Sequence, residues 1–191
     1  MAASPDTSIP IWLPDLQRGR RRAKERAFEA FLDAWHERLY AHCRRMMGNH
    51  EDAADVTQET LLQVYKSASQ FEGRSSFSTW VFTIASRKSL DALKRRKRDR
   101  TVAFDDAFAE AHAALQSDAL FSGDEAELQL HAAIAALPPR QRQVFNLRYF
   151  EEMPFGQIAA LTGTSEGSLK ASYHHAAQKI KSFVTASLEL T

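Results

Sequence analysis

The sequence is poor in cysteine, glycine and proline, and each shortage limits what the chain can be. Its 191 residues include one cysteine, Cys43, so no disulfide can form within the chain and nothing indicates an oxidising compartment. There are seven glycines and six prolines, and no stretch shows the sustained apolar and polar alternation of a half-buried strand. No apolar run approaches a membrane span, and residues 1–17 lack the apolar core of a signal peptide. We therefore expect an all-α protein of the cytoplasm without membrane insertion.

Charge is spread unevenly along the chain, although the formal net charge is only +1. Residues 18–26 hold six basic side chains against Glu25 alone, and residues 87–100 hold eight against two aspartates. Residues 105–127 hold seven acidic side chains and no Lys or Arg. The near-neutral total is thus a cancellation between segments that act separately. The run at 18–26 fits two interpretations equally, a solvated helix start or a contact with DNA or a protein partner.

The spacing of apolar residues predicts two groups of helices. In the first group, one helix ends near Gly48, a second covers about residues 51–69, and a third begins near Ser78, capped by Ser78 or Ser76. In the second group, helices resume near Glu125 and are interrupted at two consecutive prolines. We predict two small helical domains, residues 25–100 and 127–185, with an N-terminal extension 1–24, a tail 186–191 and an acidic linker 101–126, helical in part between Asp105 and Leu115.

The last third of the chain has the layout of a helix-turn-helix. Pro154 opens a short helix, residues 162–164 interrupt it, and a second helix starts at Ser165, which we expect to be its N-cap. A second helix set across a short turn on a compact first helix fits the major groove of DNA. This motif predicts that the chain reads DNA.

The predicted helix at 51–69 carries a polar stripe, in which Asp52, Asp55 and Glu59 recur at spacings of three and four. Leu62 falls within this polar face. A solvated helix face is one explanation for such a stripe. Carboxylates around an exposed leucine suit a basic protein partner better than they suit water, and phosphates would repel them. The stripe therefore predicts a protein-binding surface.

Three segments together resemble the extracytoplasmic-function sigma factors of bacterial RNA polymerase. They read DAADVTQETLLQVYKSASQF, FSTWVFTIASRKSLDALKRRKR and LPPRQRQVFNLRYFEEMPFGQIAALTGTSEGSLK, in the order and spacing of that family. The resemblance covers roughly residues 25–100 and 128–183. It implies a sigma factor that directs core polymerase to specific promoters and opens DNA at initiation, without catalytic residues, cofactor or metal.

By this resemblance the first domain is sigma region two. Its acidic helix would bind the clamp coiled coil of the β′ subunit through Asp52, Asp55, Gln58, Glu59 and Leu62. The loop 70–76 would capture an unstacked base of the non-template strand at the −10 element. The residues implied in −10 DNA binding are Arg74, Ser75, Ser76, Phe77, Arg87, Lys88, Lys94 and Arg95. Phe77 is equally explained as a core residue at helical spacing.

The second domain resembles sigma region four, which reads the −35 element and meets the β flap. The residues implied there are Arg140, Arg142, Ser165, Ser168, Lys170, Ser172, Tyr173 and His174. The resemblance also allows an anti-sigma protein as a partner, and no residue identifies one. Two positions depart from the family pattern, Ser86-Arg87 where Arg-Asn is usual and Ala171-Ser172 where Ser-Arg is frequent. Both are expected to face DNA, so the promoter preference does not follow from the family.

Two other classes of protein are alternatives to a sigma factor. A stand-alone helix-turn-helix regulator would share the DNA-reading motif and would not need the acidic stripe with Leu62. A hydrolytic enzyme built on Asp52, Asp55 and Glu59 is disfavoured, because no Gly-rich phosphate loop, nucleophile–base pair or metal-ligand set accompanies them.

Overall fold

The computed structural model describes residues 9–96, 104–118, 121 and 123–188, and every regular element within these ranges is helical. The first group comprises α1 (Leu13–Arg18), α2 (Arg21–Met47), α3 (His50–Ser67), the 3-10 turn η1 (Ala68–Gln70) and α4 (Phe77–Arg96). The second comprises α5 (Phe104–Gln116), α6 (Glu125–Ala136), α7 (Pro139–Tyr149), α8 (Phe155–Thr162) and α9 (Glu166–Leu188). The all-α prediction is confirmed. None of the helices in the described ranges is long and apolar enough to cross a membrane.

Local sequence signals set the ends of the helices in the first group. Gly48 ends α2 with a left-handed φ of 84°, and Asn49 then caps α3 by accepting the Asp52 N–H at 2.9 Å. Ser76 caps α4, because its Oγ accepts the Thr79 N–H at 3.1 Å. Of the two serines considered from the sequence, Ser76 is therefore the cap.

An aromatic cluster forms the core of the first group. Phe31, Trp35 and Phe77 meet with ring centroids 5.6 to 6.2 Å apart, and Trp12 lies against Phe31 and Phe77. The short helix α1, which the sequence analysis left within an undefined extension, buries Leu13 and Leu16 in this core. The described part of the extension thus belongs to the folded body.

The acidic linker is helical where this was expected and is packed against the rest of the chain. α5 lies along α6 because its apolar side, with Leu115 almost fully buried, meets Leu128 and Ala132. Arg44 of α2 binds Asp118 just after α5, with Nη2 to Oδ2 at 2.5 Å. The described part of the linker is therefore fixed on the body by both an apolar face and an ion pair.

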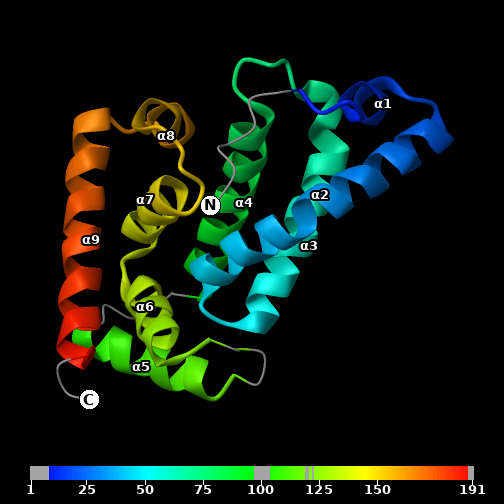
Figure 1. Ribbon diagram of the computed structural model, residues 1–191. Helices are drawn as coiled ribbons and strands as arrows, with labels where there is room; N and C mark the ends of the chain where they lie inside the picture. The colour runs from blue at the N-terminus through cyan, green and yellow to red at the C-terminus, as the bar shows by residue number, and fades with distance from the viewer. Residues whose placement is uncertain (1–8, 97–103, 119–120, 122, 189–191) are drawn as a thin grey trace.

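The two groups of helices form one body, as Figure 1 shows with α7 lying between α9 and α4. Side chains from the second group complete the core of the first, among them Val144, Leu147, Met153 and Ile158. The two domains expected from the sequence are joined by the linker and also contact each other directly. α2 contacts α6 and α7, and α4 contacts α7 and α8.

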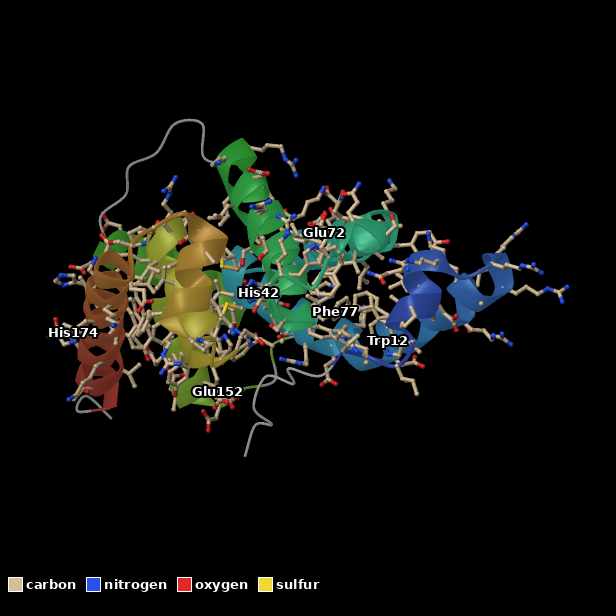
Figure 2. All side chains as sticks on the ribbon, turned by 90° about the horizontal axis from the view of Figure 1, so that it is seen from above. Trp12, His42, Glu72, Phe77, Glu152 and His174 are labelled. Atoms are coloured by element: carbon tan, nitrogen blue, oxygen red, sulfur yellow. The ribbon has the colours of Figure 1, made fainter. Side chains whose placement is uncertain are left out.

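His42 lies fully buried in α2, where that helix meets α4 and the second group (Figure 2). Its Nε2 lies 3.3 Å from the Ser86 hydroxyl of α4. Burial, with a smaller contribution from the Arg45 charge, lowers the pKa of His42 to about 3. His42 is therefore neutral in the folded protein at any pH near neutrality.

This buried histidine predicts a pH-dependent stability. The unfolded chain protonates His42 below about pH 6.5 and the folded chain does not, so its contribution is complete above pH 6.5 and is lost as the pH falls toward 3. Urea unfolding between pH 7 and 4.5 should show a wild-type free energy that falls more steeply than that of His42→Gln, by roughly 1 kcal/mol per pH unit. His36→Gln, at an exposed position of α2, should keep the wild-type slope. Parallel curves for wild type and His42→Gln would refute this assignment.

Candidate partner-binding and DNA-binding surfaces

The structure places the acidic stripe on the side of α3 that faces away from the core. Asp55, Gln58 and Leu62 are exposed, and the Leu62 side chain is 49% accessible. Asp52 and Glu59 are half-buried at the edge of the same face. The opposite side of the helix is buried, with Ala53, Val56, Thr57, Thr60, Leu61 and Val64 in the interior. All five residues predicted to bind the polymerase therefore share one accessible side of α3.

An open groove of about 460 Å³ adjoins this stripe between the start of α3 and the end of α4. Its polar lining is acidic apart from Asn49 and Arg95 and includes Glu51, Asp52, Asp55 and Glu59. Glu59 also links α3 to α4, because its oxygens lie 3.3 Å from Lys88 Nζ and 3.8 Å from Arg95 Nη2. Lys88 and Arg95, which we predict to bind DNA, thus neutralise Glu59, which we predict to bind the polymerase.

The loop between η1 and α4 presents the side chains predicted to capture a base. Arg74 and Ser75 are exposed, and Gly73 makes the turn before them with φ of 72°, a conformation that favours glycine. Arg74 pairs with Glu72 at 2.6 Å, and both side chains are open to solvent. The Ser76 hydroxyl is engaged in capping α4, so Arg74 and Ser75 are the more available pair for a ligand.

α1 packs against the start of this loop and holds it in place, a contact that the sequence did not predict. The Gln17 side-chain amide donates to the Phe71 carbonyl at 2.8 Å and to the Ala68 carbonyl at 3.2 Å. Figure 2 shows Trp12 beside Phe77 at the foot of the loop, with ring centroids 5.4 Å apart. The only sequence signal was the apolar set of Trp12, Leu13 and Leu16, bounded by Pro10 and Gly19.

Two positions expected to face DNA at the −10 surface lie in the interior. Phe77 is 3% exposed within the aromatic cluster, which supports the core explanation. Ser86 is fully buried beside His42, so its departure from the family pattern adjusts packing rather than the DNA-facing surface. Arg87 and Lys94 remain exposed on α4.

The helix-turn-helix forms as predicted from α8 and α9. Gly163, with φ of 68°, ends α8, and the Ser165 hydroxyl accepts the Ser168 N–H at 3.3 Å as the N-cap of α9. Of the residues predicted to contact the −35 element, Arg140, Ser165, Ser168, Lys170 and His174 are exposed. His174 lies on the outer side of α9 in Figure 2, far from Trp12.

Tyr173 and Ser172 are half-buried. The Tyr173 ring stacks on Phe145 at 5.7 Å and meets the edge of Phe155 at 5.9 Å, so much of it serves to fix α9 on α7 and α8. Its position on α9 still leaves part of the ring accessible.

Arg142 is buried, although we had predicted that it touches phosphate. Its guanidinium donates to the carbonyls of Met46, Ala135 and Leu137 and so joins α7 to the ends of α2 and α6. Residues two apart on a helix point about 200° apart, which explains why Arg140 faces solvent and Arg142 faces inward. In this arrangement Arg142 is a structural residue.

Glu151 is the central polar contact between the two groups of helices. It is 7% exposed, and its carboxylate meets Arg45 Nη2 at 2.9 Å and Arg38 Nη2 at 3.4 Å, with His42 Nδ1 at 3.9 Å. Burial raises the pKa of Glu151, and the two guanidinium groups partly offset this. Nothing in the sequence around Glu151 indicated that its partners lie in α2.

Two family models match the chain over both groups of helices. Sigma-70 region 2 matches residues 31–99, and Sigma-70, region 4 matches residues 127–180. The chain is 34% identical over 133 residues to the ECF RNA polymerase sigma factor SigF of Caulobacter vibrioides, covering 70% of this chain and 71% of that protein. It is 26% identical over 170 residues to SigW of Bacillus subtilis, covering 84% and 90%.

Two solved structures share the fold. RpoE from Bartonella quintana, in complex with the anti-sigma factor NepR, superposes with a TM-score of 0.65 at 20% identity, covering 83% of this chain and 96% of that one. CnrH, in complex with the cytosolic domain of CnrY, gives 0.62 at 22% identity, covering 92% and 96%.

The contact around Glu151 predicts that reversing its charge separates the two groups of helices. Glu151→Lys would place a fourth cationic or basic group beside Arg38, Arg45 and His42, and disrupting a buried pair costs about 3–5 kcal/mol. Small-angle scattering should give a radius of gyration near 16 Å for wild type and a value several Å larger for the variant, at unchanged helical content. Glu152→Lys makes the same charge change at the adjacent exposed position and should leave the radius unchanged. Equal radii for all three proteins would contradict the role assigned to Glu151.

Proposed function

The chain belongs to the extracytoplasmic-function group of the sigma-70 family, non-enzymatic polymerase subunits that direct RNA polymerase to promoters, and we propose how its surfaces divide this task. The acidic stripe of α3 binds core polymerase. The loop before α4 and the exposed face of α4 hold the opened −10 region, and α9 reads the −35 duplex. The observation that carries this division is the position of Leu62, exposed among carboxylates on a face that DNA would avoid.

The polymerase contact is proposed on the clamp coiled coil of the β′ subunit. Asp52, Asp55 and Glu59 supply negative charge that complements a basic helical partner, and Gln58 offers both a donor and an acceptor. Leu62 provides the apolar group that is desolvated at the centre of such an interface. The second group of helices would meet the β flap, which places α9 on upstream DNA.

The −10 surface combines base capture with phosphate binding. Arg74 and Ser75 project from a loop that α1 and the aromatic cluster hold in place, so an unstacked base meets a preformed site. Arg87, Lys94 and Arg95 follow along α4, where contacts to phosphates add salt-dependent affinity without reading sequence.

The −35 surface is the N-terminal half of α9 with the start of α7. Ser165 and Ser168 lie at the N-terminus of α9, and the N-terminal end of a helix favours a phosphate. Lys170, Ser172, Tyr173 and His174 follow as candidates for base and backbone contact, and Arg140 would touch phosphate beside them.

The two groups of helices must separate before both surfaces can act on one promoter. The −10 and −35 elements are about 25 base pairs apart, roughly 85 Å at 3.4 Å per pair. In the structure, Thr79 at the start of α4 donates to the Gln157 side chain of α8 at 2.8 Å. The folded body therefore brings together surfaces that the promoter would hold far apart.

An anti-sigma protein is a further proposed partner. Both structural neighbours were solved with an anti-sigma factor or a cytosolic partner domain, and this chain shares their fold. Such a protein would meet the factor in the cytoplasm, where the polymerase acts, and could hold the body in its closed arrangement.

Reconstitution with core polymerase and runoff transcription from a pool of genomic fragments tests the function. We expect RNA that starts at a small set of fragments only when this protein is added, and the starts define the promoter. Binding of fragments without any RNA would favour a stand-alone helix-turn-helix regulator instead.

A docking variant tests the acidic stripe separately. Asp55→Lys combined with Leu62→Ala should weaken association with core polymerase by at least tenfold, because it reverses a charge and removes the apolar contact. Asp33→Lys, which makes the same charge change at an exposed position of α2, should bind as wild type does. Affinity is measured with labelled protein and core enzyme alone, and an unchanged affinity of the double variant would exclude the stripe as the docking surface.

A further inference from the structure

A group of exposed arginines at the start of α2 has no role in the functions described so far. It consists of Arg18, Arg20, Arg21, Arg22 and Arg26, which we call the N-terminal basic cluster. The cluster precedes residue 31, where the match to region 2 begins. Among the described residues, one acidic side chain pairs with it, Glu25, at 2.9 Å from Arg21, and both groups are open to solvent.

The cluster begins beside the base-capture loop, at Arg18, and extends away from it along the start of α2. Gln17, which binds the carbonyls of Ala68 and Phe71 at the entrance to the loop, directly precedes Arg18. α1 also packs against η1, so its position relative to the loop is fixed by buried side chains and not by the loop alone. Figure 1 shows α1 beside the top of α3, where the chain turns into the loop toward α4, and the start of α2 beyond α1.

The order of these elements indicates on which side of the captured base the cluster lies. α4 begins at Phe77 beside the loop, and its basic end at Lys94 and Arg95 lies about 26 Å away along the helix axis. We take that end to follow the DNA upstream of the captured base, on the side of the −35 element. α1 packs at the loop end of α4, so a strand that passes the loop continues toward the cluster on its downstream side.

We propose that the N-terminal basic cluster binds phosphates of the opened non-template strand immediately downstream of the base held by the loop 70–76. The proposal rests on the proposed function and extends it to a surface of this chain that neither family model covers. Arginine suits this partner because its planar fork donates to phosphate oxygens in pairs. Ile11, which is 97% exposed next to Trp12, adds an apolar side chain where unstacked bases would lie.

The charge of the cluster favours DNA over a protein partner. Six basic groups against one acid within residues 18–26 complement an unbroken line of phosphates, which carries one charge per nucleotide on a single strand. Lys24 is partly committed elsewhere, since its ammonium lies 4.4 Å from the centre of the Tyr65 ring. The five arginines of the cluster extend into solvent at the end of the body opposite α9, which Figure 2 shows as nitrogen-tipped side chains around the start of α2.

The first test uses the full-length chain alone and a fluorescent 12-nucleotide dT strand. Arg18→Gln, Arg20→Gln and Arg22→Gln are combined in one variant, and the matched control carries Lys at the same three positions. Three lost phosphate contacts should reduce the slope of log affinity against log salt by about 2, at about 0.7 per contact. The Lys control should keep the wild-type slope. Equal slopes for wild type and the Gln variant would overturn the proposal, whatever the outcome of the polymerase experiments.

The second test locates the contact within the assembled holoenzyme. Forked templates carry the promoter found by runoff transcription, with the non-template strand either ending at the captured base or continuing six nucleotides downstream. For wild type and the Lys control, the longer strand should strengthen binding roughly tenfold at low salt. For the Gln variant this gain should vanish, while binding of the shorter template stays unchanged.

The two remaining outcomes are also decisive. If the Gln variant loses affinity for core polymerase in the absence of DNA, the cluster is a protein contact and the proposal is refuted. If wild type directs no promoter-specific RNA, the proposed function fails, and the dT measurement still decides whether the cluster binds a single strand.

Discussion

Burial of the Glu151 carboxylate is the constraint on which the closed arrangement of this protein depends. A carboxylate taken out of water is costly unless cations replace its hydration, and here the guanidinium groups of Arg45 and Arg38 do so from α2. These partners are more than 100 residues away in sequence, so the two groups of helices must dock in one relative position to satisfy the charge. The neighbouring core, with Val144 and Leu147 completing the aromatic side of α2, fixes the same position by apolar contact.

A charged contact of this kind also suits the proposed separation of the two groups of helices. Well-packed apolar residues would often be at least as stable as a buried ion pair, whereas separated ions regain their hydration when water enters. Hydration of the separated ions therefore offsets part of the free energy that is needed to break the contact at Glu151. Arg142 contributes one bond of the same kind between the two groups, to the Met46 carbonyl at the end of α2, which water can satisfy equally well; its bonds to the Ala135 and Leu137 carbonyls lie within the second group. The proposed function, in which α9 and α4 act at two separated promoter elements, would use such a reversible interface.

Much of the fold could be predicted from the sequence because its signals are local. The helices, the Ser165 cap and the break at Gly163 depend on neighbours within a few residues, and periodicity reveals them. The short helix α1 escaped prediction because six residues are too few to show a period. The burial of Ser86 and Arg142 could not be predicted, because the groups that cover them come from other helices, whereas for Phe77 helical spacing already offered the core as one of two explanations. For the same reason the sequence predicted the partial helix in the linker but not its packing against α6.

Glu59 connects the two proposed activities of the first group of helices. It belongs to the acidic stripe, and it neutralises Lys88 and Arg95 on the adjacent helix that would follow DNA. Its side chain is 43% accessible, and ion pairs this open to solvent contribute at most about 1 kcal/mol, so a basic polymerase helix could take over Glu59 at little cost. Lys88 and Arg95 would then be released toward phosphate at the moment when polymerase is bound. The charge pattern thus favours DNA binding after docking, which would keep the unbound factor from occupying promoters without the enzyme.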